Sequence, residues 1–115
     1  MDNCIFCKIA KKEIPSKIVH EDDSFFAFLD IKPIVNGHTL IIPKRHFVNF
    51  LDMPSSLGSE MSDFIKRIAE IRINEGAEGF NLLMRNGKAA GQDVFHAHIH
   101  LIPRKSGDGI SSLSV

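Results

Sequence analysis

Apolar and polar residues alternate from residue 95 to residue 101, where single apolar residues separate three histidines. Successive side chains of a β-strand point to opposite faces, so this alternation predicts a strand, which we extend over 95–103. Four apolar side chains are expected in the core: Phe95, Ala97, Ile99 and Leu101. The strand would then present a row of three imidazoles on its other face: His96, His98 and His100.

A different period predicts one long helix in the middle of the chain. Apolar residues recur there at intervals of three and four, which is the spacing of one helix face: Leu57, Met61, Phe64, Ile65, Ile68 and Ile71. Ser55 or Ser56 is the candidate N-cap, and Gly76 is the candidate stop after the last turn.

Shorter apolar runs predict the remaining elements. A short helix is expected over 4–12, a short extended piece over 17–21, and strands over 25–30, 38–43 and 80–85. Loops are expected around 31–37 and 86–93, with an irregular tail over 106–115. Five extended segments, one long helix and hairpin-length connections favour an α+β fold with a largely antiparallel five-stranded sheet. Because no repeat or composition break interrupts residues 1–115, we expect a single domain.

Charge and composition narrow the classes of partner. The 14 basic and 14 acidic residues give a formal net charge of zero, which argues against nucleic acid and anionic membranes but allows a small anionic ligand. No apolar run approaches the roughly 18 residues of a membrane span. Residues 1–4 lack the basic start and apolar stretch of a secretory signal, so we expect a cytoplasmic protein.

The row of histidines suggests three interpretations. It is either a half-exposed strand without chemistry, a catalytic zinc site or a set of imidazoles with separate tasks. Alternate strand positions spread the ring nitrogens over roughly 13 Å, so convergence on one zinc ion would require bending. Separate tasks are favoured, with the central imidazole attacking phosphorus while its neighbours hold charge or protons. The glycines and amides of 86–93 suit phosphate binding, although a plain hairpin turn has the same composition.

Both cysteines lie in the segment Cys4-Ile5-Phe6-Cys7. In a reducing compartment this spacing is typical of half a zinc site or a redox pair rather than a structural disulfide. Coincidence is the third interpretation, because two cysteines alone do not complete a four-ligand metal site.

The whole pattern resembles the histidine triad (HIT) superfamily. Residues 96–102, His-Ala-His-Ile-His-Leu-Ile, match the family motif His-φ-His-φ-His-φ-φ, in which φ is apolar. Other segments resemble the family in order: 4–9, 14–15, 21–22, 27–31, 37–44, 79–81, 86–87, 90–92 and 103–104. The resemblance is to small Hint-like and microbial HIT hydrolases. It implies the HIT fold and a homodimer formed through the long helix and the strand over 80–85.

The resemblance implies a nucleotidyl hydrolase or transferase that cleaves the α-phosphorus bond of purine nucleoside phosphoramidates or related conjugates. By position in the motif, His98 would be the nucleophile and would form a nucleotidyl-histidine. His100 would bind a non-bridging phosphate oxygen, and His38 would assist phosphate binding or proton delivery. Two alternatives stay open: a dinucleoside polyphosphate hydrolase, and a non-catalytic, zinc-stabilised nucleotide-binding protein.

The resemblance also assigns binding residues. Asp30 matches the carboxylate that binds the ribose. The phosphate-side positions are Asn86, Gly91, Gln92 and Asp93. The apolar walls of the base pocket are Ile5, Phe6, Ile9, Phe28 and Leu40. Asp93 departs from the family pattern of serine or threonine, and an ionised carboxylate cannot donate a hydrogen bond. Either its side chain points away or the leaving-group preference is altered.

Zinc-containing members of the family suggest how the cysteine pair is completed. The four ligands would be Cys4, Cys7, His46 and His96. A closed Cys2His2 tetrahedron leaves no position for a reacting water, so this zinc would be structural. His20 matches no motif and is expected at the surface.

Overall fold

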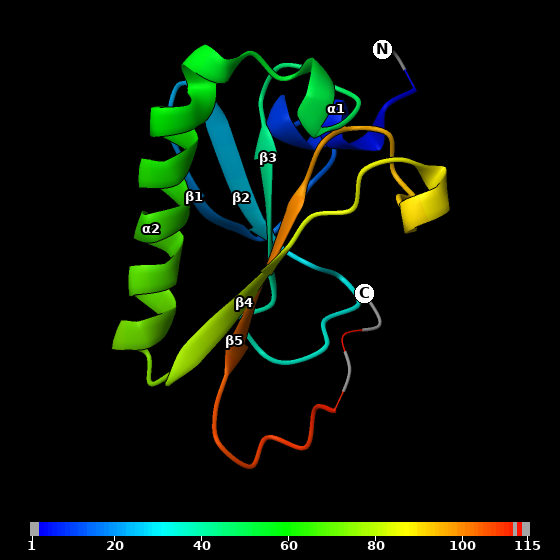
Figure 1. Ribbon diagram of the computed structural model, residues 1–115. Coiled ribbons are helices and arrows are strands. Elements are labelled where there is room, and N and C mark those ends of the chain that lie inside the picture. The colour runs from blue at the N-terminus through cyan, green and yellow to red at the C-terminus, as the bar shows by residue number, and fades with distance from the viewer. Residues whose placement is uncertain (1–2, 112, 114–115) are drawn as a thin grey trace.

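The computed structural model describes residues 3–111 and 113, and its centre is an antiparallel sheet of five strands (Figure 1). In chain order the strands are β1 (Ile18–Glu21), β2 (Phe25–Leu29), β3 (Thr39–Pro43), β4 (Gly79–Leu83) and β5 (Ile99–Arg104). Their order across the sheet is β1-β2-β3-β5-β4. The predicted α+β fold is therefore confirmed.

Two α-helices flank the sheet: α1 (Ile5–Ala10) and α2 (Gly58–Asn74). Three short 3-10 turns lie in the connections: η1 (Phe50–Asp52), η2 (Ser55–Leu57) and η3 (Lys88–Ala90). The predicted serine N-cap is wrong, because Ser55 and Ser56 form η2 and no side chain caps α2. The predicted stop agrees with the structure, since Gly76 adopts φ +110° just after the helix ends.

The sheet is the middle layer between the two helices, as Figure 1 shows. One face packs on α2 through Phe25, Ala27, Ile41, Phe64, Ile68, Ala69, Ile99 and Leu101. The other face packs on α1 through Phe6, Ile9, Phe26, Phe28, Leu40 and Ile42. Burial on both faces explains why β2 and β3 are apolar at nearly every position, instead of alternating.

The histidine segment is a strand only in its second half. β5 begins at Ile99, and residues 95–98 lie outside the strand instead of continuing the ladder. The backbone N–H of Ala97 donates to the carbonyl of Phe47, at 2.7 Å, in the loop that follows β3. Ala97, Ile99 and Leu101 are buried as predicted, but Phe95 is 48% exposed and its predicted place in the core is wrong.

Strand register brings the central histidines together. β3 pairs with β5 so that Leu40 lies opposite His100, and His38 directly precedes β3. Residues 106–111 and 113 contain no helix or strand, in agreement with the predicted tail. Residues 112, 114 and 115 of that tail lie outside the described residues. None of the helices described could cross a lipid bilayer.

Candidate functional site

His98 is held in a single tautomer by the backbone. Its Nδ1 lies 2.8 Å from the carbonyl oxygen of His96. A carbonyl can only accept a hydrogen bond, so Nδ1 carries the proton and Nε2 keeps its lone pair. The His98 ring is buried, and the ring of Phe6 packs edge-on against it at a centroid distance of 5.1 Å. In its neutral form the side chain therefore presents Nε2 with a lone pair and a fixed orientation, which is what nucleophilic attack requires.

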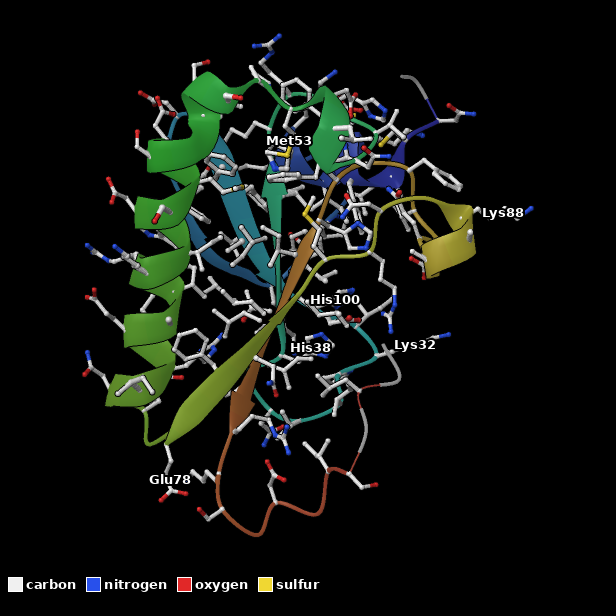
Figure 2. All side chains as sticks on the ribbon, viewed as in Figure 1. Lys32, His38, Met53, Glu78, Lys88 and His100 are labelled. Atoms are coloured by element: carbon white, nitrogen blue, oxygen red, sulfur yellow. The ribbon has the colours of Figure 1, made fainter. Side chains whose placement is uncertain are left out.

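His38 and His100 form a relay whose tautomers the backbone also decides. Ile34 donates its backbone N–H to Nδ1 of His38, at 3.1 Å, so His38 carries its proton on Nε2. That Nε2–H lies 3.0 Å from Nδ1 of His100 and donates to it. Figure 2 shows where the two histidines lie in the fold. His100 therefore carries its own proton on Nε2, where it can be donated to a further partner.

Burial keeps this relay neutral. Removal from water lowers the pKa of His38, an effect that the nearby Asp30 carboxylate partly opposes. Burial, reinforced by the neighbouring His98 and His38, lowers the pKa of His100 to about 4. At neutral pH both rings are uncharged, so each offers the one donor and one acceptor that the relay needs.

Asp30 lies beside the contact between the two rings. Its Oδ2 is 3.5 Å from Nε2 of His38 and 4.0 Å from Nδ1 of His100, while Oδ1 accepts the backbone N–H of Lys32 at 2.9 Å. Asp30, His38 and His100 are close enough to suggest a metal site. A metal on Nε2 of His38 would force the proton onto Nδ1, against the N–H of Ile34. The three side chains are better suited to a hydrogen-bonded cluster.

A cleft of about 600 Å³ opens beside Asp30 and His38 and has Lys17, Ile31 and Pro33 among its lining residues. Its position next to Asp30 is consistent with a sugar-binding role for that carboxylate. Four of the predicted base-pocket residues are instead buried in the core between α1 and the sheet: Phe6, Ile9, Phe28 and Leu40. Ile5 is 49% exposed. A base would therefore contact only the outer edges of this cluster.

The loop over 86–93 is pinned by its two amides. Gln92 is buried, and its Oε1 accepts the N–H of Gly87 at 2.8 Å. Its Nε2 donates to the carbonyls of Val48 and Val94, so both amide hydrogens are engaged within the protein. Contact between Gln92 and phosphate would have to replace one of these bonds. Oδ1 of Asn86 accepts the N–H of Phe50 at 2.8 Å. The Nδ2 group of Asn86 takes no part in this hydrogen bond.

Two further predicted positions lie in this loop. Gly91 adopts φ +88°, and a Cβ there would lie 3.0 Å from the Arg85 side chain, so a larger residue does not fit without movement. Asp93 does not point away from the site. Its Oδ1 lies 3.9 Å from Nε2 of His98, and its side chain is 82% exposed. The carboxylate therefore stands at the mouth of the site, beside the nitrogen proposed to attack.

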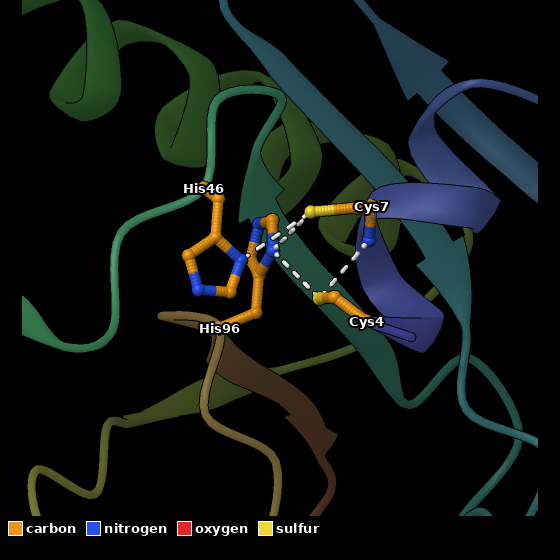
Figure 3. Close-up of side chains that lie close together, drawn as sticks. All are labelled: Cys4, Cys7, His46 and His96. Atoms are coloured by element: carbon orange, nitrogen blue, oxygen red, sulfur yellow. Dashed lines mark hydrogen bonds between the residues drawn. The ribbon is translucent and has the colours of Figure 1, made fainter. Parts of the chain in front are cut away.

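Cys4, Cys7, His46 and His96 converge although they come from three separate segments (Figure 3). Cys7 Sγ lies 3.3 Å from Nδ1 of His46 and 3.5 Å from Nδ1 of His96, and Cys4 Sγ lies 3.4 Å from Nδ1 of His96. Tetrahedral zinc with Zn–S of about 2.3 Å and Zn–N of about 2.0 Å would separate sulfur from nitrogen by about 3.5 Å. The donor set and its spacing therefore fit Zn²⁺.

The surroundings of the cluster also suit a metal. His96 donates from Nε2 to the carbonyl of Pro43 at 2.8 Å, which leaves Nδ1 free of a proton and facing the cysteines. Burial lowers the pKa of His96 and keeps its ring neutral. Burial and then the hydrogen bond to Cys4 raise the pKa of the Cys7 thiol to about 11, so a bound metal would displace its proton.

Sequence reasoning missed Arg72. This arginine is buried, and it donates from Nε to the carbonyl of Gly37 and from NH2 to Oγ1 of Thr39, both at 2.9 Å. The two acceptors flank His38 in the chain. The sequence does contain a signal for Arg72, because position 72 continues the apolar helix stripe of Phe64 and Ile68 at the same interval of four. A charged residue on the buried stripe indicates a specific partner.

Comparison with known sequences agrees with the motif. The model of the HIT domain matches residues 11–107. An uncharacterised HIT-like protein of Methanocaldococcus jannaschii is 48% identical over 109 residues, covering 92% of this chain and 82% of the relative. The adenylylsulfatase HINT3 of Arabidopsis thaliana is 43% identical over 93% of this chain and 55% of its own length. The adenosine 5'-monophosphoramidase HNT1 of Candida albicans is 42% identical, covering 90% of this chain and 71% of the relative.

Solved structures show the same fold. The protein SMU.412c of Streptococcus mutans superposes with a TM-score of 0.90 at 42% identity, covering all of this chain and 74% of its own. A zinc-bound histidine triad family protein of Mycobacterium smegmatis gives a TM-score of 0.88 at 41% identity, covering 96% of this chain and 81% of its own. On the strength of its motif, its fold and these relatives, the chain belongs to the HIT family.

Proposed function

We propose that this protein is a nucleotide hydrolase that cleaves the α-phosphorus bond of purine nucleoside phosphoramidates or related conjugates. The observation that carries the proposal is the tautomer of His98, whose Nδ1–H is fixed on the His96 carbonyl so that Nε2 keeps a lone pair. Family membership and the named activities of the Arabidopsis and Candida relatives support the same reaction class.

The reaction would proceed in two displacements at one phosphorus. Nε2 of His98 attacks Pα, the bond from Pα to the leaving group breaks, and that bond's electron pair departs with the leaving group, which takes up a proton from solvent. Water then attacks Pα and releases one proton to solvent, and the electron pair of the bond from phosphorus to Nε2 returns to the imidazole. His100 donates from Nε2 to a non-bridging oxygen where negative charge develops. His38 orients His100, and Asp30 would accept from the ribose hydroxyls.

Cys4, Cys7, His46 and His96 would hold a structural zinc ion. All four ligand positions are taken by protein atoms, so the ion would supply rigidity rather than a reactive water. It would tie the start of α1 to the segment that carries His98. The zinc-bound Mycobacterium relative and the spacing of the four donor atoms support this assignment.

The leaving group is constrained by Asp93. A carboxylate 3.9 Å from the attacking nitrogen would repel every substrate phosphate, and it would repel an additional phosphate in the leaving group more strongly than a neutral amine. This arrangement favours phosphoramidates over the alternative substrates, dinucleoside polyphosphates, whose leaving group is anionic. The non-catalytic alternative is disfavoured because the hydrogen bond from Nδ1 of His98 orients the ring and leaves Nε2 free of the tautomeric proton.

We also propose a homodimer. β4 is an edge strand of the sheet, and its exposed Phe80 and Leu82 line a cleft of about 600 Å³ with Met61, Ile65 and Ile73 of α2. Exposed apolar side chains next to an unpaired strand edge are suited to pairing with a second copy. The two sheets would then join through β4.

The test of the reaction class is intact-mass spectrometry after mixing with adenosine 5'-phosphoramidate and rapid acid-free quenching. An adenylyl adduct on the wild type that is lost in His98→Ala would support a nucleotidyl-histidine. His20→Ala is the matched control, because the ring of His20 stacks on Phe64 away from the relay. Nucleotide binding without an adduct or release of AMP, from either phosphoramidate or dinucleoside polyphosphate, would favour the non-catalytic alternative.

A further inference from the structure

Arg72 encloses the backbone on both sides of His38. Its Nε donates to the carbonyl of Gly37 and its NH2 to Oγ1 of Thr39, each at 2.9 Å. The hydroxyl of Thr39 in turn donates to the same Gly37 carbonyl at 2.7 Å. These three hydrogen bonds form a closed set that joins the last turn of α2 to the start of β3.

The burial of this guanidinium is not explained by a strong ion pair. Its ionic partner is Glu75, at 2.7 Å from NH1, and the Glu75 side chain is 60% exposed. Exposed pairs of this kind contribute little to stability, whereas removing a guanidinium from water is costly. The position continues a buried apolar stripe, where a hydrophobic side chain would avoid that cost. The arginine must therefore supply something that depends on its planar set of donors.

Gly37 shows how closely the two segments approach. It adopts φ +90°, and a Cβ built there would lie 3.1 Å from Nε and 3.2 Å from Cδ of Arg72, and 3.3 Å from Cγ of Pro103. The loop before His38 is thus pressed against the guanidinium, and a side chain at position 37 would fit only if Arg72 or Pro103 moved. Small movements of Arg72 would consequently be transmitted to the backbone that carries His38.

We propose that Arg72 is a positioning residue for the active site, an inference that rests on the proposed function. By fixing Gly37 and Thr39, it holds His38 where Nδ1 accepts from Ile34 and Nε2–H donates to Nδ1 of His100. That relay keeps the His100 proton on Nε2, facing the phosphate. Arg72 contacts no substrate, and it acts only through the orientation of His38.

The test combines ¹⁵N NMR of the imidazoles with steady-state kinetics on Arg72→Lys. In the wild type, His38 and His100 should both show the Nε2–H tautomer. In the variant, His100 should become a mixture of both tautomers, because lysine retains the charge but not the two directed donors. For the phosphoramidate, kcat should fall about tenfold with KM within about twofold, since His100 serves the developing charge.

Two further variants make the result decisive. Arg104→Lys removes a comparable set of guanidinium hydrogen bonds, to Asn81, Asp108 and Ile110, outside the relay, and should leave the histidine signals and kcat unchanged. If Arg72→Lys fails to fold, Thr39→Val removes one acceptor from the same set and should shift the His100 tautomer in the same direction. A folded Arg72→Lys with wild-type imidazole signals would overturn the inference. The NMR experiment reports the position of the His100 proton even if the wild type forms no adduct, so failure of the proposed reaction can be told apart from failure of this inference.

Discussion

His96 links the proposed metal cluster to the proposed nucleophile, because its ring faces the two cysteines while its backbone carbonyl accepts the 2.8 Å hydrogen bond from Nδ1 of His98. The ring is held on its other side by the Pro43 carbonyl. Fixing the His96 ring therefore also fixes the carbonyl that determines the His98 tautomer. A structural metal at this point would stabilise both the fold and the site.

The first prediction concerns zinc content and stability. Purified protein should contain one zinc per chain by native mass spectrometry, and Cys7→Ser should contain none. If free zinc exceeds its dissociation constant about a thousandfold, the bound ion stabilises the fold by about 4 kcal/mol, which chelation should remove. Adduct formation on His98 should slow in parallel. Absence of zinc from protein with all four ligands intact would overturn the metal assignment.

The second prediction concerns Asp93. Asp93→Ser should raise kcat/KM for phosphoramidates about fivefold, because two unit charges about 4 Å apart in water repel by about 1 kcal/mol. The added hydroxyl also restores a donor next to the phosphate. The matched control is Asp23→Ser, which removes an exposed carboxylate outside the site. An unchanged or lower specificity constant would show that the carboxylate does not act on the substrate anion.

The third prediction compares two glycines. Gly37→Ala should lower the free energy of unfolding by about 1–3 kcal/mol, because a Cβ at φ +90° is strained and would crowd Arg72. Gly58→Ala is the matched control, since Gly58 has helical φ and ψ and a Cβ there meets nothing within 4 Å. Chemical denaturation of both variants checks the difference. Equal stability of the two variants would mean that the loop before His38 can move away from α2.

Local patterns predicted much of the fold because burial is periodic. α2 follows from its apolar spacing, and β2 and β3 follow from runs that are buried on both faces. The strand over 95–103 was predicted too long at its start. His96 turns toward the cysteines and Ala97 bonds to Phe47, so contacts with distant segments replace the ladder there. Alternation alone does not reveal such tertiary contacts.

The candidate site, like the fold, was predictable only in part. The sequence placed His98, His100 and His38 together through the family motif, and the structure brings them side by side. It could not assign their tautomers, because these depend on the backbone N–H of Ile34 and the carbonyl of His96. Backbone partners are independent of residue type, so only the folded structure reveals them.

The fourth prediction concerns the oligomer. Sedimentation or native mass spectrometry should show a dimer, and Leu82→Arg on the exposed face of β4 should convert it to a monomer. A buried unpaired charge at the centre of such an interface is strongly destabilising. Leu51→Arg is the matched control, because Leu51 is 89% exposed on η1 and away from β4. A monomeric wild type would contradict the proposed assembly.

The last prediction is a pH dependence of stability. The pKa of His100 is lowered from 6.5 to about 4 in the folded state, so between these values the unfolded chain binds more protons than the folded one. Stability from this group is therefore complete above pH 6.5 and is lost as the pH falls through about 4. The loss should reach about 3 kcal/mol. Because acid also releases zinc, the measurement is the difference between wild type and His100→Gln in denaturant unfolding at saturating zinc. If the unfolding free energies of the two proteins changed equally with pH, His100 would not remain neutral in the fold.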